Sequence, residues 1–241
     1  MEYIELRDKL LKRYDRFFKD MEIDPQTGIV NGSSKRFTGY PYIGRNYCNA
    51  PIRILFIPLD VGEDECADKN TYHSFQDRQD IFPDGMLDFN YHIAGLYATA
   101  LFILKDVMGY QQAWEMLCKE RDCSNKISIR RTYDFLPKDL MSYVAYENRY
   151  RFVTVKREDE RKGDKDRVWL NLDIERQMLM DEIELFSPNI IVFQGKEGLN
   201  GCNINELQKK YKVIVTGHPS CYQHKMNRIQ YILDNIGPQL N

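Results

Sequence analysis

Residues 52–60 read IRILFIPLD, a short and nearly continuous apolar run that ends in an aspartate. Runs of this kind are typical of central strands in a parallel sheet, which are buried on both faces. NIIVFQG at 189–195 and YKVIVTG at 211–217 have the same character. The β-branched and aromatic segment 142–155, SYVAYENRYRFVTV, predicts a further strand that breaks into polar residues midway. The sequence therefore predicts four strands.

Helical patterns separate these runs, and polar segments connect them. We expect helices at residues 3–20, 88–108, 111–120, 173–187, 203–210 and 224–236. We expect irregular connections at 24–49, which is rich in Gly, Pro, Ser and Asn, and at 61–87. The charged segment 157–167 is either a solvated loop or a contact to DNA.

Strands that alternate with helices predict a parallel sheet covered on both faces. The fold class is therefore α/β. We expect a single domain over residues 1–241, in which a helix and loop extension (1–49) precedes an α/β core (50–241).

Composition narrows the class of protein. The chain has 241 residues, 43% of them hydrophobic and 12% aromatic, which is enough for a substantial core. No apolar run approaches the roughly 20 residues that span a bilayer, and no signal-peptide pattern opens the chain, so we expect a soluble cytoplasmic protein. A net charge of −2 argues against a generally basic surface but leaves room for a local basic groove.

The six cysteines do not form any CxxC pair. Zinc sites and secreted disulfide frameworks usually show closer spacing. We expect reduced thiols, with no metal and no cofactor, and a metal or iron–sulfur site is the alternative. The residues concerned are Cys48, Cys66, Cys118, Cys123, Cys202 and Cys221.

Polar side chains follow the predicted strands where each one ends. Asp60 closes the first strand, Asn148 lies within the second, and His218 follows the last. The carboxyl ends of parallel strands meet at one edge of the sheet, where α/β proteins place their ligands. A carboxylate can orient water, an amide can bind a polar substrate, and a histidine can stabilise developing negative charge. These groups together indicate hydrolysis.

The order of these motifs resembles the uracil-DNA glycosylase superfamily. ILFIPLDVGEDE, an Asn-bearing strand, PNIIVFQGKEG and VIVTGHPS follow one another with similar spacing over roughly residues 40–236. The resemblance implies a three-layer αβα sandwich with a central four-stranded parallel sheet. The chain lacks the pattern of the iron–sulfur branches, four cysteines that begin with a close pair, and its first motif differs from that of the strictly uracil-specific enzymes.

The resemblance also implies roles for individual residues. Asp60 would orient the attacking water, and His218 would donate a hydrogen bond to the pyrimidine O2 as the glycosidic bond breaks. Asn148 would bind the Watson–Crick edge of the flipped base. Phe75 is the first candidate to stack on that base, and Tyr72 is the second.

Further positions concern the DNA and the size of the pocket. Pro219 and Ser220 would shape the last loop and contact phosphate, while Tyr222 and Gln223 would fill the space that the base leaves. Gly62 stands where the strictest uracil enzymes carry a bulky tyrosine, so the pocket would accept larger bases.

The resulting hypothesis is a monomeric, monofunctional DNA glycosylase. It would excise a flipped pyrimidine, either uracil or a modified cytosine or uracil, including bulky phage-type bases, in DNA repair or antiphage defence. One alternative is a non-catalytic nucleic-acid or nucleotide-binding module on the same fold. Another is an unrelated α/β hydrolase that acts on a small nucleoside or phosphoester.

Overall fold

A computed structural model describes residues 1–58, 72–81, 91–120, 135–154, 170–195, 199, 202–217 and 228–240. Within these residues the main sheet has five strands in the order β2-β4-β3-β6-β7. Four are parallel, and β2 pairs antiparallel with β4 at one edge. Their bounds are β2 Tyr42–Ile43, β3 Ile54–Pro58, β4 Val144–Tyr146, β6 Ile190–Gln194 and β7 Lys212–Thr216.

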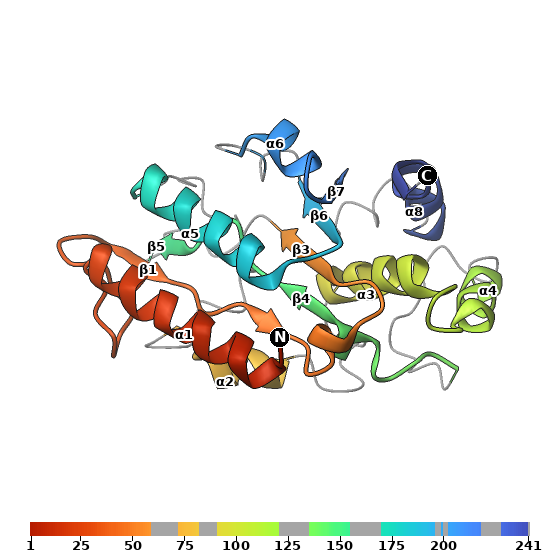
Figure 1. The fold of residues 1–241 in the computed structure, drawn as a ribbon, viewed down its shortest axis with the longest axis horizontal. Coiled ribbons are helices and arrows are strands. Elements are labelled where there is room, and N and C mark those ends of the chain that lie inside the picture. Colours follow the sequence, from red (N-terminus) through yellow and green to blue (C-terminus); the bar gives the residue numbers. More distant parts are fainter. Residues whose placement is uncertain are drawn as a thin grey trace.

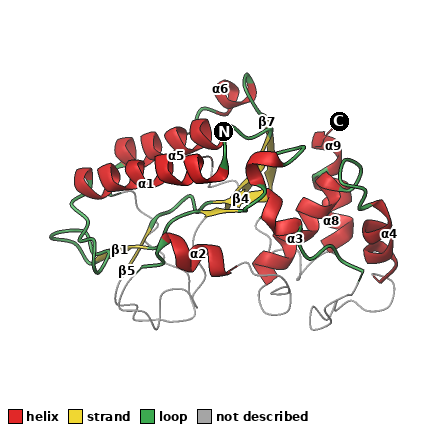
Figure 2. Ribbon diagram, turned by 60° about the horizontal axis from the view of Figure 1, so that its bottom comes forward, coloured by secondary structure: helices red, strands yellow, loops and turns green. Residues whose placement is uncertain are grey.

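Helices cover both faces of this sheet, as Figures 1 and 2 show. Helices α1 and α5 lie side by side on one face, and α3, α4 and α8 lie on the other. The bounds of these helices are α1 Tyr3–Asp20, α3 Tyr91–Leu104, α4 Gln111–Glu120, α5 Leu172–Phe186 and α8 Arg228–Asn235. The α/β class predicted from the sequence is therefore confirmed.

Alternation along the strands divides the core into two halves. In β3, Leu55 and Ile57 pack toward α1 and α5, whereas Ile54 and Phe56 pack toward α3 and α8. β6 and β7 alternate in the same way. Successive strand residues point to opposite faces, so these continuous apolar runs are explained by burial on both sides.

The predicted N-terminal helix is confirmed as α1. Its buried side includes Leu10, Tyr14 and Phe17, and it packs along α5. Asn171 caps the start of α5 by accepting a hydrogen bond from the Ile174 amide, and Ser187 ends it in the left-handed conformation. Helices α1 and α5 together form the helical layer on one face of the sheet, which we call the α1 side.

The segment 24–49, expected to be irregular, contains ordered strands. β1 (Lys35–Phe37) pairs antiparallel with β5 (Phe152–Thr154) in a separate two-stranded sheet, and β2 joins the main sheet. A short 3-10 helix, η1, covers Tyr47–Asn49. The prediction of a long loop was wrong because strands of two or three residues carry no periodic signal and depend on distant partners. The expected sheet of four strands accordingly has a fifth.

The remaining described elements lie close to their predicted positions, with one exception. Part of the connection predicted at 61–87 is the helix α2 (Phe75–Ile81). Where these segments are described, the helices predicted at 88–108, 111–120, 173–187, 203–210 and 224–236 are confirmed. The smaller elements are η5 Leu140–Tyr143, α6 Ile204–Gln208 and α9 Gly237–Leu240.

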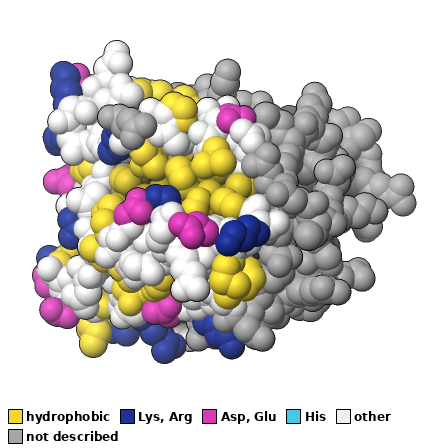
Figure 3. Space-filling model, turned by 90° about the vertical axis from the view of Figure 1, so that its right-hand side faces the viewer, with side chains coloured by type: hydrophobic (Ala, Val, Ile, Leu, Met, Phe, Trp, Pro, Cys, Tyr) yellow, Lys and Arg dark blue, Asp and Glu magenta, His cyan; other side chains and the backbone are white. Residues whose placement is uncertain are grey.

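The end of the molecule that carries α4 and α8 exposes hydrophobic side chains among charged ones (Figure 3). Val107, which precedes α4, and Leu233 of α8 are among the exposed large hydrophobic residues. Exposed apolar residues are ordinary on globular domains, so this surface needs no ligand to explain it. Across the described segments, no helix combines the length and the apolarity required to cross a membrane.

Candidate active site

The carboxyl ends of the parallel strands place four residues in one row across the sheet. Gln194 pairs with Pro58 on one side and with Thr216 on the other. The Arg149 amide donates to the Pro58 carbonyl at 2.8 Å, which places Asn148 opposite Pro58. We call Asn148, Pro58, Gln194 and Thr216 the terminal row.

Helices α3, α4 and α8 cover one face of the sheet, which we call the α3 face. On this face the terminal row marks a change from apolar to polar side chains. Two residues earlier, the same face carries Tyr146, Phe56, Val192 and Ile214, which are part of the hydrophobic core or pack against it. Each terminal-row residue lies on the same face as its neighbour two positions earlier. The polar side chains of the row are nevertheless buried, since Asn148 is 7%, Gln194 1% and Thr216 4% exposed.

Asn148 is held in a defined orientation. The Tyr146 hydroxyl donates a hydrogen bond of 2.9 Å to Oδ1 of Asn148. Because a buried amide with one bonded end cannot rotate without losing that bond, Tyr146 determines where the NH₂ group lies. This is the kind of restraint that a binding side chain needs.

Pro58 limits the hydrogen bonding between β3 and the β4 side of the terminal row. A proline has no backbone N–H, so it is usually excluded from the middle of a sheet. Its carbonyl still accepts from Arg149, but it cannot donate to β4. Within the described residues, this is the last hydrogen bond between the two strands.

Helix α8 is bonded to the end of β7. The Tyr231 hydroxyl accepts hydrogen bonds from the Gly217 amide at 2.6 Å and from the Thr216 hydroxyl at 3.2 Å. The end of β7, two residues before His218, is thereby fixed to the helical layer on the α3 side.

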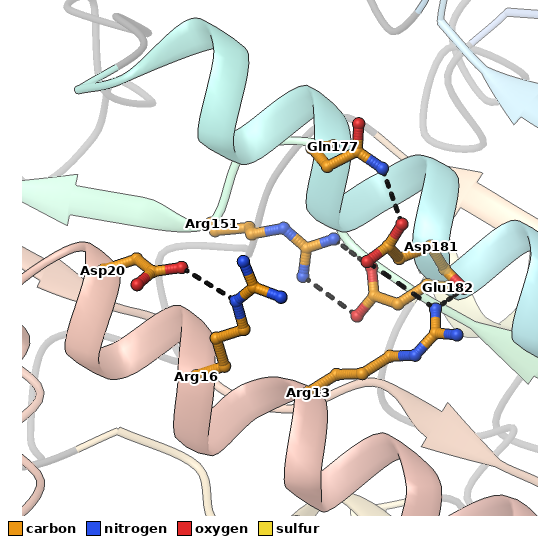
Figure 4. Close-up of polar contacts among 7 residues, drawn as sticks. All are labelled: Arg13, Arg16, Asp20, Arg151, Gln177, Asp181 and Glu182. Atoms are coloured by element: carbon orange, nitrogen blue, oxygen red, sulfur yellow. Dashed lines mark hydrogen bonds and ion pairs between the residues drawn. The ribbon is translucent and has the colours of Figure 1, made fainter.

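A buried charge cluster lies beyond Asn148 on the α1 and α5 side. The Arg151 guanidinium forms ion pairs with Glu147 and Glu182 and donates to the Tyr14 hydroxyl at 2.6 Å. Figure 4 shows Arg151 reaching Glu182 on α5, with the more exposed pairs of α1 nearby. Burial raises the pKa of Glu182 and raises the pKa of Tyr14 well above its usual value. The cluster fixes the segment that follows Asn148 to both helices.

Glu175 is a further buried carboxylate of α5. It accepts hydrogen bonds from the backbone amides of Leu170 and Asn171, at 2.8 and 3.1 Å. Burial still raises the pKa of Glu175 above its ordinary value, because desolvation outweighs those two bonds and the nearby arginines. Glu175 therefore caps the start of α5, although burial disfavours its charged form.

Of the site residues predicted from the sequence, Asn148 lies in the terminal row. β3 ends at Pro58 and β7 ends at Thr216, each two residues before a predicted catalytic side chain. The following predicted residues lie outside the described part of the chain: Asp60, Gly62, His218, Pro219, Ser220, Tyr222 and Gln223. Their roles stay predictions.

The two candidate stacking residues lie in an aromatic cluster on the α1 side. The ring of Tyr72 is 5.4 Å from the rings of both Phe18 and Phe37, and its hydroxyl donates to the Pro25 carbonyl at 2.9 Å. Phe75 begins α2, with its ring 6.5 Å from that of Tyr40. Asn148 shares the opposite face of the sheet with Tyr146, so these contacts do not bring either ring together with Asn148.

Gln194 was not among the site residues predicted from the sequence. It is a polar residue at the end of a strand whose five residues are all buried. Tyr146 and Tyr231 were not predicted from the sequence, because their roles depend on hydrogen bonds to Asn148, Thr216 and Gly217 that only the tertiary structure shows.

Comparison of the chain with protein-family models, with curated proteins and with solved structures found no match. Where the structure describes the chain, it holds no group of three or more His, Cys, Asp or Glu side chains arranged to bind a metal ion.

Proposed function

We propose that this protein is a DNA glycosylase with a uracil-DNA glycosylase-like fold. It binds DNA as a monomer and hydrolyses the N-glycosidic bond of a flipped pyrimidine. The terminal row is the observation that carries the proposal. It supplies buried hydrogen-bonding side chains at the edge of the sheet where an α/β fold binds its ligand.

Asn148 supports the recognition step. A base inside a duplex is out of reach, so the enzyme must extrude it and bind its Watson–Crick edge. The amide of Asn148 matches such an edge, which has hydrogen-bond donors and acceptors side by side, and Tyr146 orients it in advance. Preorganisation of this kind lowers the entropy that binding costs.

The chemical step follows from the two predicted catalytic residues. Asp60 orients a water molecule toward C1′ of the sugar and stabilises positive charge as the C–N bond breaks. The bonding electrons leave with the base, and a hydrogen bond from His218 to the pyrimidine O2 stabilises that charge. The products are an abasic sugar and the free base.

Cleavage of oligonucleotides tests the proposal. Single- and double-stranded DNA with uracil, hypoxanthine, 5-hydroxymethylcytosine or its glucosylated form is incubated with the protein and treated with hot alkali, which cuts abasic sites. We expect cleavage of at least one pyrimidine substrate. Asp60→Asn and His218→Ala should each reduce it by about 10²- to 10⁴-fold.

Controls separate catalysis from folding and from other functions. Asp20→Asn, at the exposed end of α1, is the matched carboxylate control and should cleave like the wild type. Binding without cleavage on every substrate would favour a non-catalytic binding module. Activity on free nucleosides, with DNA affinity that does not fall with salt, would favour a small-molecule hydrolase.

A further inference from the structure

The buried charge cluster of Glu147, Arg151 and Glu182 holds two acidic groups and one basic group. Arg151 forms ion pairs with both glutamates, and Figure 4 shows it reaching Glu182. Glu147 is 1%, Arg151 2% and Glu182 0% exposed. If both carboxyl groups were ionised, the interior would contain one uncompensated negative charge. Such a charge is strongly disfavoured away from water, and carboxyl groups that share a site avoid it by keeping a proton.

The nearby cations of the described chain have other partners or lie elsewhere. Arg13 of α1 donates to the backbone carbonyl of Asp181 and lies 3.8 Å from its carboxylate. Arg149 lies near Glu175, whose negative charge compensates its own. Lys35 is buried at the end of β1 that lies away from the cluster. The two glutamates of the cluster therefore share a single cation.

The tyrosines beside the cluster stay neutral. The Tyr14 hydroxyl accepts from Arg151 at 2.6 Å and donates to Glu182. Burial raises the pKa of Tyr14 well above its usual value, and it also raises the pKa of Tyr40, whose ring centroid is 4.5 Å from that of Tyr14. The two carboxyl groups are therefore the groups of the cluster that exchange a proton.

The two carboxyl groups are held to different degrees. Glu182 accepts from both terminal nitrogens of Arg151 and belongs to the regular helix α5. Glu147 is bonded through Oε1 alone, and among the described residues its buried Oε2 has no hydrogen-bond partner. Glu147 also lies just past the end of β4, and Asn148 is the next residue. A change in the charge of the cluster would therefore displace Glu147, and Asn148 with it, rather than Glu182.

We propose that Glu147 and Glu182 share one proton and that this proton is a pH-dependent switch for Asn148. With the proton bound, the cluster is neutral and Asn148 stays in the terminal row. As pH rises and the proton leaves, two negative charges face one cation, and the segment that carries Glu147 and Asn148 shifts. The inference adds regulation to the proposed site, and its consequence for DNA rests on the proposed glycosylase function.

Infrared spectroscopy of the free protein tests for the proton, because a neutral carboxyl group and a carboxylate absorb at different frequencies. We expect the wild type to show a neutral carboxyl band that disappears as pH rises and that Glu182→Gln lacks. Glu147→Gln should lack it too, which keeps the test valid if one variant does not fold. Glu175 is present in all these proteins, so its own signal cancels in the difference. Glu184→Gln, on the exposed side of α5, is the matched control and should keep the band.

Nuclear magnetic resonance tests the coupling to Asn148. The side-chain amide signal of Asn148, assigned by its loss in Asn148→Asp, is followed over a series of pH values. In the wild type it should shift with the same midpoint as the infrared band. In Glu182→Gln, where one carboxylate and one cation balance without a proton, that shift should be absent.

Cleavage kinetics test the consequence for DNA. For the best oligonucleotide substrate, kcat/KM of the wild type should fall by about 2- to 10-fold across that midpoint, as for the loss of one hydrogen bond. Since other titrating groups are common to both proteins, the ratio of kcat/KM between Glu182→Gln and the wild type isolates the switch. That ratio should rise with pH, and the ratio for Glu184→Gln should stay constant.

The outcomes distinguish this inference from the proposed function. A band that is missing in the wild type, or that persists in both glutamine variants, overturns the shared proton. A band without a matching response of Asn148, or a constant ratio of kcat/KM for Glu182→Gln, overturns the switch and leaves the glycosylase function intact. No cleavage of any oligonucleotide, with the band and the Asn148 response both observed, overturns the glycosylase function and leaves the proton and its coupling to Asn148 established.

Discussion

The hydroxyl of Tyr146 donates a 2.9 Å hydrogen bond to the side-chain oxygen of Asn148, two residues further along the chain. Both side chains lie on the α3 face of the sheet, at the point where its core gives way to the terminal row. The bond leaves the amide nitrogen of Asn148 as the group directed away from Tyr146. In the proposed site, recognition by Asn148 would therefore depend on Tyr146, a residue that need not touch the ligand.

Tyr146→Phe should weaken recognition without unfolding the protein. Removing one neutral hydrogen bond costs about 0.5–1.5 kcal/mol, which corresponds to a fall of about 2- to 10-fold in kcat/KM. The measurement is the initial rate of base excision over a range of oligonucleotide concentrations. Tyr110→Phe, which removes an exposed 3.3 Å bond to Asp139, is the matched control and should not change kcat/KM. Equal rates in both variants would show that Tyr146 does not position Asn148.

Arg151→Met should be strongly destabilising. Both Glu147 and Glu182 would remain buried without their cation, and breaking such a cluster costs about 3–5 kcal/mol. Urea denaturation with linear extrapolation measures the change in the free energy of unfolding.

Two comparisons test the reason for that loss. Arg16→Met removes an exposed pair with Asp20, in which the Arg16 side chain is 84% exposed, and should change stability by less than about 0.5 kcal/mol. Adding Glu182→Gln to Arg151→Met should recover part of the loss, because one unpaired charge is removed. A double variant less stable than Arg151→Met alone would contradict the electrostatic explanation.

Glu175→Gln should change how stability depends on pH. The pKa of Glu175 is raised by burial, so the folded chain binds more protons than the unfolded chain between the ordinary glutamate pKa and the folded pKa. The wild type therefore loses stability as pH rises through that window. The glutamine keeps an acceptor for the amides of Leu170 and Asn171 but does not titrate.

The expected result is a variant whose stability relative to the wild type increases from pH 4 toward neutral pH. Urea denaturation at a series of pH values measures this difference. Asp173→Asn, on the exposed first turn of the same helix, provides a control at a solvated carboxylate. A difference that stays constant with pH, or that falls as pH rises, would rule out a raised pKa at Glu175.

Gly44→Ala should strain the edge of the main sheet. A β-carbon at Gly44 would lie about 2.2 Å from the Ser142 carbonyl oxygen, so backbone would have to move. Overpacking of this kind costs about 1–3 kcal/mol. Gly237→Ala is the control, because its β-carbon would meet the Phe102 ring at an ordinary 3.6 Å. Thermal unfolding of both variants gives the comparison, and equal melting temperatures would contradict the close approach.

Much of the fold is predictable from the sequence. The apolar runs that became β3, β6 and β7 are read correctly because burial on both faces requires continuous hydrophobicity. α1 and α5 are predicted because one side of each is apolar at helical spacing. β1, β2 and α2 are not, because their stability comes from partners far away in the chain rather than from a local pattern.

The candidate site, like the fold, was only partly predictable from the sequence. The sequence by itself determined that Asp60 closes one predicted strand, that Asn148 lies within another and that His218 follows the last. Only the tertiary structure decided that Asn148, Pro58 and Gln194 share one row and one face. Register between parallel strands depends on how distant segments pack, and a shift of one residue would turn each of these side chains to the opposite face. Among the described residues the buried Gln194 amide has no hydrogen-bond partner, and this follows from that register rather than from a local sequence pattern.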